Sequence, residues 1–371
     1  MKKVEVDDLE KKRVAILFGG KSAEHEVSLE SALNIIKAIN KDKYELILIG
    51  INHKGDWFLY NSNFDFNNFK LRDPDNKIDY FEKLAVIPGN NKNQLYNLSK
   101  DEKVEEVDVF FPVLHGPFGE DGTIQGLLKT IDTPFVGAGV LSSALAMDKD
   151  FMKRLLRDKG INIADYKALR KYEELDIEKV IDELGLPLFV KPANLGSSVG
   201  VNKVEKKESL IKAVNCAFKY DNKIIIEEYI AGREIECSVL GNVNYKASLA
   251  GEIEPQSDFY SYDAKYIDDK GAKLSIPAKL SDKIINKVKD ISIKVCDILE
   301  VEDMARVDSF LTADDEIIIN EINTIPGFTN ISMYPKLWEI SGLNNENLVD
   351  KLIELAIKRY IRDKNLKTKL N

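Results

Sequence analysis

The chain is poor in the residues that most metal and disulfide sites require. Its 371 residues include only three histidines and three widely spaced cysteines, with no CxxC pair. Neither a disulfide framework nor a zinc or haem centre is therefore expected. The chain also lacks an excess of basic residues: its net charge is −9. This acidity argues against a nucleic-acid partner, because nucleic-acid-binding proteins usually carry a basic patch or stripe.

Long apolar runs are missing as well. No segment approaches the roughly 20 apolar residues that a helix needs to cross a bilayer. The N-terminal segment MKKVEVDDLEKKR lacks the apolar core of a signal peptide. We therefore expect no membrane partner and a cytoplasmic location. The hydrophobic content of 44% and charged content of 31% are ordinary for a globular enzyme, and the length predicts two or three domains.

The N-terminal third has the pattern of an α/β unit. RVAILFGG (13–20) predicts a buried strand that ends in a glycine turn, and an amphipathic helix is predicted over Glu26–Asn40. YELILIGIN (44–52) predicts a second strand. This order is typical of a parallel sheet. The Asn-rich region 54–105 shows no clear pattern, and VDVFFPVL (107–114) predicts a further buried strand.

The rest of the chain mixes helices with antiparallel strands, as in an α+β fold. One long helix is predicted over 142–160, ending at Gly160. Strand, Gly/Ser loop and strand are predicted over 187–204, followed by a strand over 223–230 and two alternating strands after it. Helices are predicted over 281–300 and 348–362, with a polar, aromatic loop at 257–271.

The segment ARVDSFLTADDEIIINEINTIPGFT (305–329) is the most informative about function. Its polar residues lie two apart among apolar ones, so they share one face of a β-hairpin. A turn centred on Asp314-Asp315 places Asp308 opposite Glu321, and Arg306 opposite Asn323. Carboxylate and amide oxygens suit Mg²⁺, which is usually held by one or two carboxylates plus substrate phosphates. The alternative is a solvated polar face with surface ion pairs.

The segment GSSVG (196–200) has two interpretations. It matches the G-x-S-x-G elbow of α/β-hydrolases, but that motif requires a following helix and a later histidine. The sequence that follows is strand-like, and no histidine occurs after His115. We therefore favour a Gly/Ser loop whose N–H groups and hydroxyls bind phosphate oxygens. It lacks the G-K-[ST] sequence of a P-loop.

Other candidate nucleotide contacts include Lys191 and Glu227, which lie at the ends of apolar predicted strands. Lys149 and Lys191 are candidate phosphate ligands, although a lysine whose stem packs on apolar surface is the alternative for Lys191. Glu227 and Glu234 are suited to accept hydrogen bonds from an adenine amino group and ribose hydroxyls, or else belong to a surface charge cluster. GAGVLSSA (137–144) lacks the third glycine of a dinucleotide-binding motif.

The order strand-KP, Gly/Ser loop, strand-EE and RVD…NEIN resembles the ATP-grasp superfamily, which couples ATP cleavage to ligation of a carboxylate and an amine. Four segments are similar to the D-alanine–D-alanine ligase family: GGKSAEHEVSLESA (19–32), HGPFGEDGTIQGLL (115–128), FYSYDAKY (259–266) and NEINTIPGFTNISMYPKLW (320–338). The resemblance implies a three-domain fold: an N-terminal parallel-sheet domain (1–138), a central ATP-grasp subdomain (139–226) and a C-terminal catalytic domain (227–371).

The resemblance also implies a set of site residues. ATP would be bound by Lys149, Lys191, Ser198, Glu227 (adenine) and Glu234 (ribose), and two Mg²⁺ (or Mn²⁺) ions by Asp308, Glu321 and Asn323. The first D-alanine would be bound by Glu24 and His115, the second by Ser332 and Met333, and the oxyanion by Arg306 and the N–H of Gly327. A trio of Ser197, Tyr266 and Glu24 would close the active-site loop, with Lys265 reaching the transferred phosphate.

These implied roles fit the chemistry of carboxylate activation. ATP converts the first carboxylate to an acyl phosphate, which the second amine attacks, and a closing loop keeps water away. For the loop tyrosines, simple packing is the alternative. Related ligases that add D-lactate lack the AKY-type loop, and those that add D-lactate or D-serine generally have arginine where this chain has Met333. The resemblance therefore favours D-alanine at the second site and implies a homodimer. A D-serine or D-lactate ligase and a nucleotide-binding protein without turnover remain the alternatives.

Overall fold

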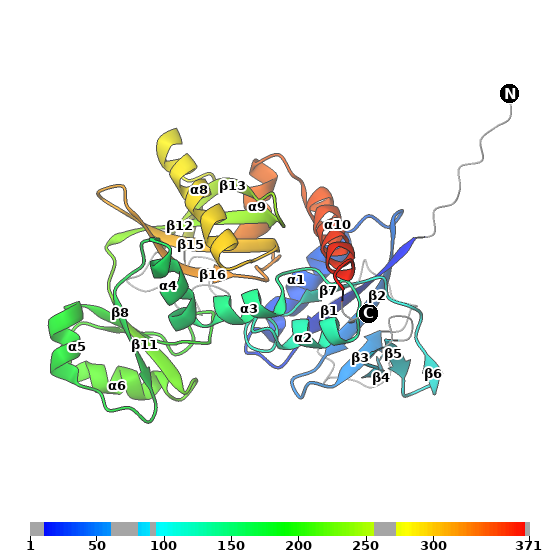
Figure 1. Cartoon of the computed structure of the whole chain (residues 1–371), viewed down its shortest axis with the longest axis horizontal. Helices are drawn as coiled ribbons and strands as arrows, with labels where there is room; N and C mark the ends of the chain where they lie inside the picture. The colour runs from blue at the N-terminus through cyan, green and yellow to red at the C-terminus, as the bar shows by residue number, and fades with distance from the viewer. Residues whose placement is uncertain (1–10, 61–80, 90–93, 256–271, 368–371) are drawn as a thin grey trace.

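The described residues form three β-sheets (Figure 1). A computed structural model describes residues 11–60, 81–89, 94–255 and 272–367. Within these ranges, no helix combines the length and the hydropathy that a transmembrane span needs. The mixture of α/β and α+β parts agrees with the prediction from the sequence.

The N-terminal sheet has seven strands in the order β6-β5-β4-β3-β2-β1-β7. Its strands are β1 (Lys12–Gly19), β2 (Tyr44–Ile51), β3 (Trp57–Tyr60), β4 (Phe81–Val86), β5 (Leu95–Asn97), β6 (Glu102–Lys103) and β7 (Val109–Val113). As predicted, β1 runs parallel to β2, and β7, predicted as a further buried strand, also runs parallel to β1. The short strands β3 to β6 add an antiparallel extension from the region where the sequence shows no clear pattern. Helices α1 (His25–Ala38) and α2 (Thr123–Thr130) follow β1 and β7 in the chain.

The second sheet has four strands, in the order β10-β9-β11-β8. It comprises β8 (Tyr166–Arg170), β9 (Leu188–Pro192), β10 (Asn202–Val204) and β11 (Lys223–Glu228), with helices α5 (Ile177–Leu184) and α6 (Lys207–Ala217). Leucine, valine and isoleucine side chains from these strands and helices form one buried cluster. The predicted strand, Gly/Ser loop and strand are β9, the loop and β10, so that prediction is confirmed.

The third sheet has five antiparallel strands in the order β14-β13-β12-β15-β16. Its strands are β12 (Gly232–Gly241), β13 (Lys246–Pro255), β14 (Ala272–Ser275), β15 (Asp303–Thr312) and β16 (Ile317–Asn323). Helices α8 (Asp282–Ile298), α9 (Met333–Ile340) and α10 (Asn345–Lys364) belong to the same half of the chain. Helix α8 packs its apolar face on the central strands of this sheet, in a cluster that includes Val288, Val295 and Ile235.

The single long helix predicted over 142–160 is wrong. Two helices occur there, α3 (Val140–Met147) and α4 (Lys149–Asp158), and they are separated at Asp148. Asp148 has an extended backbone, and its side chain accepts hydrogen bonds from the N–H groups of Asp150 and Phe151. It also forms an ion pair of 2.6 Å with Lys223. An N-cap of this kind satisfies backbone donors and starts a new helix.

The predicted β15–β16 hairpin is present, and its polar pairs are in the predicted register. Asp308 lies opposite Glu321, and Arg306 lies opposite Asn323. The strands reach this register through a shift between Asp308 and Ser309, where Ile319 is paired with Ser309 and Asn320 is the extra residue. Such a β-bulge re-aims side chains and is common beside active sites. The sequence pattern alone did not predict it.

The C-terminal helix α10 packs back on the N-terminal sheet. Its buried residues Leu348, Leu352 and Ile353 belong to the same cluster as Val14 and Phe111 of that sheet. Figure 1 shows α10 beside β7 and α1. The two ends of the described chain therefore share one core, although more than 200 residues separate them in the sequence.

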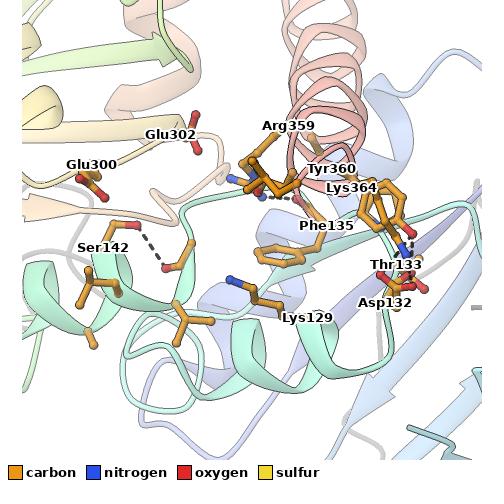
Figure 2. Close-up of a pocket in the computed structure, with 18 residues that line it drawn as sticks. Lys129, Asp132, Thr133, Phe135, Ser142, Glu300, Glu302, Arg359, Tyr360 and Lys364 are labelled. Carbon is orange, nitrogen blue, oxygen red and sulfur yellow. Dashed lines mark hydrogen bonds and ion pairs between the residues drawn. The ribbon is translucent and has the colours of Figure 1, made fainter. Parts of the chain in front are cut away.

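A buried arginine fixes this contact between the two ends. Arg359 of α10 donates hydrogen bonds of 2.6 Å to the carbonyl oxygens of Phe135 and Gly137, and lies 3.2 Å from the buried carboxylate of Asp303. Asp303 also accepts the N–H of Gly137 at 3.0 Å. Arg359 borders a surface pocket of about 840 Å³, in which Figure 2 shows it beside Phe135 and Tyr360.

We expect Arg359→Met to lower the free energy of unfolding by about 3 kcal/mol or more, because it leaves the Asp303 carboxylate buried without its partner. Urea unfolding of the intact chain measures the loss. Arg362→Met is the matched control: Arg362 lies three residues after Arg359 on the same helix, pairs with Glu302 and is half exposed. Exposed pairs contribute only about 0–1 kcal/mol. Equal losses in the two variants would contradict the role of Arg359.

Candidate active site

The polar face of the β15–β16 hairpin forms a connected cluster. The guanidinium of Arg306 donates two hydrogen bonds to the carboxylate of Asp308, at 2.8 and 2.7 Å. Asn323 donates its amide N–H to the same carboxylate at 3.0 Å. Arg306 also lies 2.9 Å from Glu236 on the adjacent strand β12. The side-chain amide oxygen of Asn323 is left as an acceptor, since its nitrogen is directed to Asp308.

The bulge brings two consecutive residues of β16 to two lysines. Asn320 accepts a hydrogen bond of 3.1 Å from Lys191 of β9. Glu321 forms an ion pair of 3.3 Å with Lys149, the first residue of α4. Lys149 also donates to the carbonyl oxygen of Leu195 at 2.9 Å. Both predicted phosphate ligands, Lys191 from the four-stranded sheet and Lys149 from α4, therefore reach the carboxylate-bearing strand β16.

The Gly/Ser loop between β9 and β10 contacts the N-terminal half of the chain. Its residues Ser197 and Ser198 have φ angles of 54° and 57°. Left-handed conformations of non-glycine residues are costly and cluster at functional sites. The Ser197 hydroxyl donates a hydrogen bond to the Glu24 carboxylate. Glu24 lies against Gly116, where a Cβ atom would stand only 2.3 Å from its Oε2, so a larger residue at 116 would displace it.

His115 connects the loop after β7 to the segment that follows β16. Its Nδ1 donates to the carbonyl oxygen of Ile325 at 2.9 Å, and its Nε2 lies 3.2 Å from the hydroxyl of Ser31. That hydroxyl also accepts the N–H of Phe328 at 3.0 Å. Burial, with a smaller contribution from the charge of Arg306, lowers the pKa of His115 to about 4. His115 is therefore neutral at neutral pH, with Nε2 as an acceptor for Ser31.

Glu120 reinforces the same connection. Its carboxylate accepts the N–H of Gly116 and the N–H of Ile325, both at 2.9 Å. Burial raises the pKa of Glu120 to about 7, and the nearby charge of Glu24 raises it too. Gly327 lies in the segment held by Glu120, His115 and Ser31. A Cβ atom at Gly327 would stand 2.7 Å from the Ser332 hydroxyl, so only glycine fits there without a shift.

We expect the stability of the wild-type chain, relative to Glu120→Gln, to fall as the pH rises from about 4.5 to 7. Because the folded-state pKa lies above the ordinary value, the folded chain keeps a proton in this window that the unfolded chain loses. The stability that protonated Glu120 contributes is fully present below the pKa of Glu120 in the unfolded chain. It is lost as the pH rises through the pKa of Glu120 in the folded chain. Urea unfolding of both proteins at pH 5 and pH 7.5 measures the difference. A difference that does not change with pH would contradict the raised pKa.

The remaining predicted residues lie around these groups. Glu227 is buried on β11 and pairs with Lys191, and Glu234 lies half-buried near the start of β12. Ser332 precedes α9 and holds the turn before it, accepting the N–H of Thr329 at 2.9 Å. The Met333 side chain is buried against Gly251 and Leu337, and Met333 is the first residue of α9. Lys265 and Tyr266, with the segment FYSYDAKY, lie outside the described residues.

Several residues of this site were missed by reasoning from the sequence. They are Ser31, Glu120, Lys153, Glu236 and Asn320. Only Lys153 carried a usable signal, because it follows Lys149 by four residues and so lies on the same face of a helix. The others depend on contacts between segments that are distant in the sequence.

The hairpin side chains fit a divalent cation that prefers oxygen ligands. Asp308 and Glu321 offer carboxylate oxygens, and Asn323 offers an amide oxygen. Within the described ranges no group of three or more His, Cys, Asp and Glu side chains is arranged to hold a metal by itself. Two carboxylates and an amide, completed by substrate phosphates, are the ligands that Mg²⁺ uses at nucleotide sites.

Comparison with known proteins places the chain in one family. Family models match residues 13–138 (D-ala D-ala ligase N-terminus) and 155–354 (D-ala D-ala ligase C-terminus). The D-alanine--D-alanine ligase of Oceanobacillus iheyensis is 51% identical over 96% of this chain and 98% of that protein. D-alanine--D-alanine ligase A of Escherichia coli K12 is 50% identical over 97% of this chain and 100% of that protein.

Comparison with solved structures indicates the same family. The D-alanine-D-alanine ligase of Coxiella burnetii has a TM-score of 0.86 and 39% identity, with 96% of both chains covered. The VanG D-Ala:D-Ser ligase of Enterococcus faecalis has a TM-score of 0.85 and 35% identity, covering 94% of this chain and 100% of that one. From its fold, its site and these similarities, the chain belongs to the D-alanine–D-alanine ligase family.

Proposed function

We propose that this protein joins two D-alanines to D-alanyl-D-alanine at the expense of ATP, for peptidoglycan precursor synthesis. The observation that carries the proposal is the meeting of Lys149 and Lys191 with Glu321 and Asn320, beside the Arg306–Asp308–Asn323 cluster. Cations for phosphates and oxygen ligands for Mg²⁺ are thereby brought to one place. In the same proposal Ser198 and Glu234 contact the phosphates and the ribose, and Glu227 contacts adenine.

In the first step the carboxylate of one D-alanine attacks the terminal phosphorus of ATP and forms D-alanyl phosphate and ADP. Lys149 and Lys191 neutralise phosphate charge. Asp308, Glu321 and Asn323 would hold Mg²⁺, which would stabilise the remaining negative charge of the transferred phosphoryl group. Glu24 holds the substrate ammonium, and the neutral His115 lies near its carboxylate. Lys265 and the trio of Ser197, Tyr266 and Glu24 are proposed to complete and close the site, which keeps water from the acyl phosphate.

In the second step the amine of the second D-alanine attacks the acyl carbon, and phosphate leaves. Arg306 and the Gly327 N–H are proposed to donate to the tetrahedral oxyanion. The carboxylate of this second substrate fits the start of α9, at Ser332 and Met333. The side chain of Ser332, the N-cap residue, makes no capping hydrogen bond in the described part of the chain, and helix N-termini bind anions through their backbone N–H groups. Because the Met333 side chain is buried, its backbone would make the contact.

Phosphate release from ATP and Mg²⁺ tests the proposal, with D-alanine, D-serine or D-lactate as the second substrate and mass spectrometry of the products. D-alanine-dependent turnover that yields the D-Ala-D-Ala dipeptide supports it. Preference for D-serine, the substrate named for the VanG relative, would instead identify the protein as a D-alanine–D-serine ligase. ATP binding without any amino-acid-dependent turnover would leave only a nucleotide-binding protein.

We propose further that the chain divides into three units, each built on one sheet, with boundaries near residues 138 and 226. β11 stays paired in the four-stranded sheet through Glu228, so we draw the second boundary just after that strand. A homodimer and a cytoplasmic location rest on the family resemblance. Light scattering of the purified chain and fractionation of the producing cells test them.

A further inference from the structure

Lys153 is a lysine whose ammonium group is completely enclosed. It lies on α4, one helical turn after Lys149, and its exposed fraction is 0%. Its Nζ is 3.2 Å from Oε2 of Glu227 and 5.8 Å from the ring centroid of Tyr166. Enclosing a charge is costly unless the charge is paired, so burial of the Lys153 ammonium group depends on its pairing with Glu227.

Glu227 lies between two lysines that differ in their access to solvent. Lys191 pairs with its Oε1 and also donates to Asn320 on β16, and its side chain keeps an exposed fraction of 10%. Lys153 faces Oε2 and has no access to solvent. Only Lys191 can therefore turn toward a bound ligand, whereas Lys153 remains against the carboxylate.

The contact between Lys153 and Glu227 is an ion pair without an aligned hydrogen bond. Lys153 Nζ and Glu227 Oε2 are both buried, and neither has a hydrogen-bond partner among the residues that the structure describes. Glu227 Oε2 can therefore still accept a hydrogen bond from a donor group of a ligand. Burial raises the pKa of Glu227, but the two lysines outweigh it and hold the pKa below its usual value. The carboxylate is thus an ionised acceptor.

We propose that Lys153 is a positioning residue for the nucleotide base: it is the permanent counter-ion that keeps Glu227 ionised and oriented toward the exocyclic amine of adenine when Lys191 turns to the phosphates. The inference rests on the proposed function, in which Glu227 contacts adenine and Lys191 contacts phosphate. Without Lys153, departure of Lys191 would leave the Glu227 carboxylate buried without a cation, which is strongly unfavourable.

This role predicts a loss of base selectivity in Lys153→Met. The probes are MgATP and the Mg²⁺ complex of purine riboside triphosphate, which lacks the 6-amino group. A hydrogen bond to a charged group contributes enough to change affinity by about 10-fold or more. We expect Lys153→Met to weaken MgATP binding by about that factor more than it weakens binding of the analogue, because both nucleotides draw Lys191 to their phosphates but only ATP loses a hydrogen bond to Glu227. In turnover, the KM for ATP should rise, with kcat and the KM for D-alanine little affected.

Titration calorimetry of the full chain without D-alanine gives these affinities. Lys212→Met, at an exposed lysine of α6, is the control and should bind both nucleotides as the wild type does. Lys153→Arg keeps the charge and should restore part of the selectivity. Equal losses for both nucleotides, or unchanged MgATP binding, would overturn the proposal, because a merely structural role does not distinguish the two bases.

A double-mutant comparison keeps the proposal testable if Lys153→Met does not fold. Glu227→Gln and the pair Glu227→Gln/Lys153→Met should bind MgATP equally, because Lys153 acts only through the Glu227 charge. A further loss in the pair would contradict it. These measurements need no ligation, so a wild type that binds MgATP selectively but makes no dipeptide would defeat the proposed function and leave this inference standing.

Discussion

Glu321→Gln is expected to lower kcat for dipeptide formation by about 10³-fold, the largest effect of any single change proposed for this protein. The substitution removes a carboxylate oxygen that suits Mg²⁺, and a bound metal supplies several kcal/mol of charge stabilisation to phosphoryl transfer. It also takes the anionic partner from Lys149, which lies 3.3 Å away and is buried. Ground-state ATP positioning and transition-state stabilisation are therefore both affected.

Phosphate release and dipeptide yield over a series of Mg²⁺ concentrations measure this effect. Because a weakened metal site fills by mass action, high Mg²⁺ should restore part of the activity of Glu321→Gln. Asp314→Asn is the matched control, since Asp314 is an exposed carboxylate at the turn of the same hairpin. Wild-type kcat in Glu321→Gln at low Mg²⁺ would refute the assignment of Glu321 as a ligand.

Arg306→Lys is expected to lower kcat by about 10²- to 10³-fold, the effect typical of removing one oxyanion donor. Lysine keeps the charge but lacks the planar fork, which in this chain holds Asp308 through two hydrogen bonds. The oxyanion forms in the second step. Loss of its donor should therefore slow capture of the acyl phosphate more than its formation, so that water competes with the amine.

The ratio of phosphate released to dipeptide formed tests this assignment, because it rises when the acyl phosphate is hydrolysed. Arg362→Lys provides the control: Arg362 makes a comparable fork to Glu302 at the surface, away from the hairpin face. A normal ratio together with normal kcat in Arg306→Lys would exclude Arg306 from the oxyanion site.

The hairpin shows how far the sequence could predict the site. Alternation of polar and apolar residues placed Arg306, Asp308, Glu321 and Asn323 on one face, and the register is confirmed. The turn alone did not fix that register, because Leu311 pairs with Ile317 near the turn, and the bulge at Asn320 then shifts the pairing by one residue. The same bulge directs both Asn320 and Glu321 toward the lysines, an arrangement that regular alternation forbids.

Local patterns determined what depends on neighbours in the chain. They predicted the parallel strands β1, β2 and β7, the Gly/Ser loop between β9 and β10, and the motifs that mark the family. These features follow from residue periodicity and turn chemistry, which the sequence carries directly. The break between α3 and α4 at Asp148 was missed because the Asp148 side chain is held partly by its ion pair with Lys223 of the distant strand β11.

Tertiary structure decided what depends on distant segments. It packed α10 on the N-terminal sheet through Arg359, and held the segment of Gly327 through Glu120, His115 and Ser31. It also enclosed Lys153 beside Glu227. Whether a charged side chain is buried, and which group neutralises it, depends on tertiary contacts between residues far apart in the sequence. That is why the sequence identified the chemical groups of this protein, and only the fold arranged them into a site.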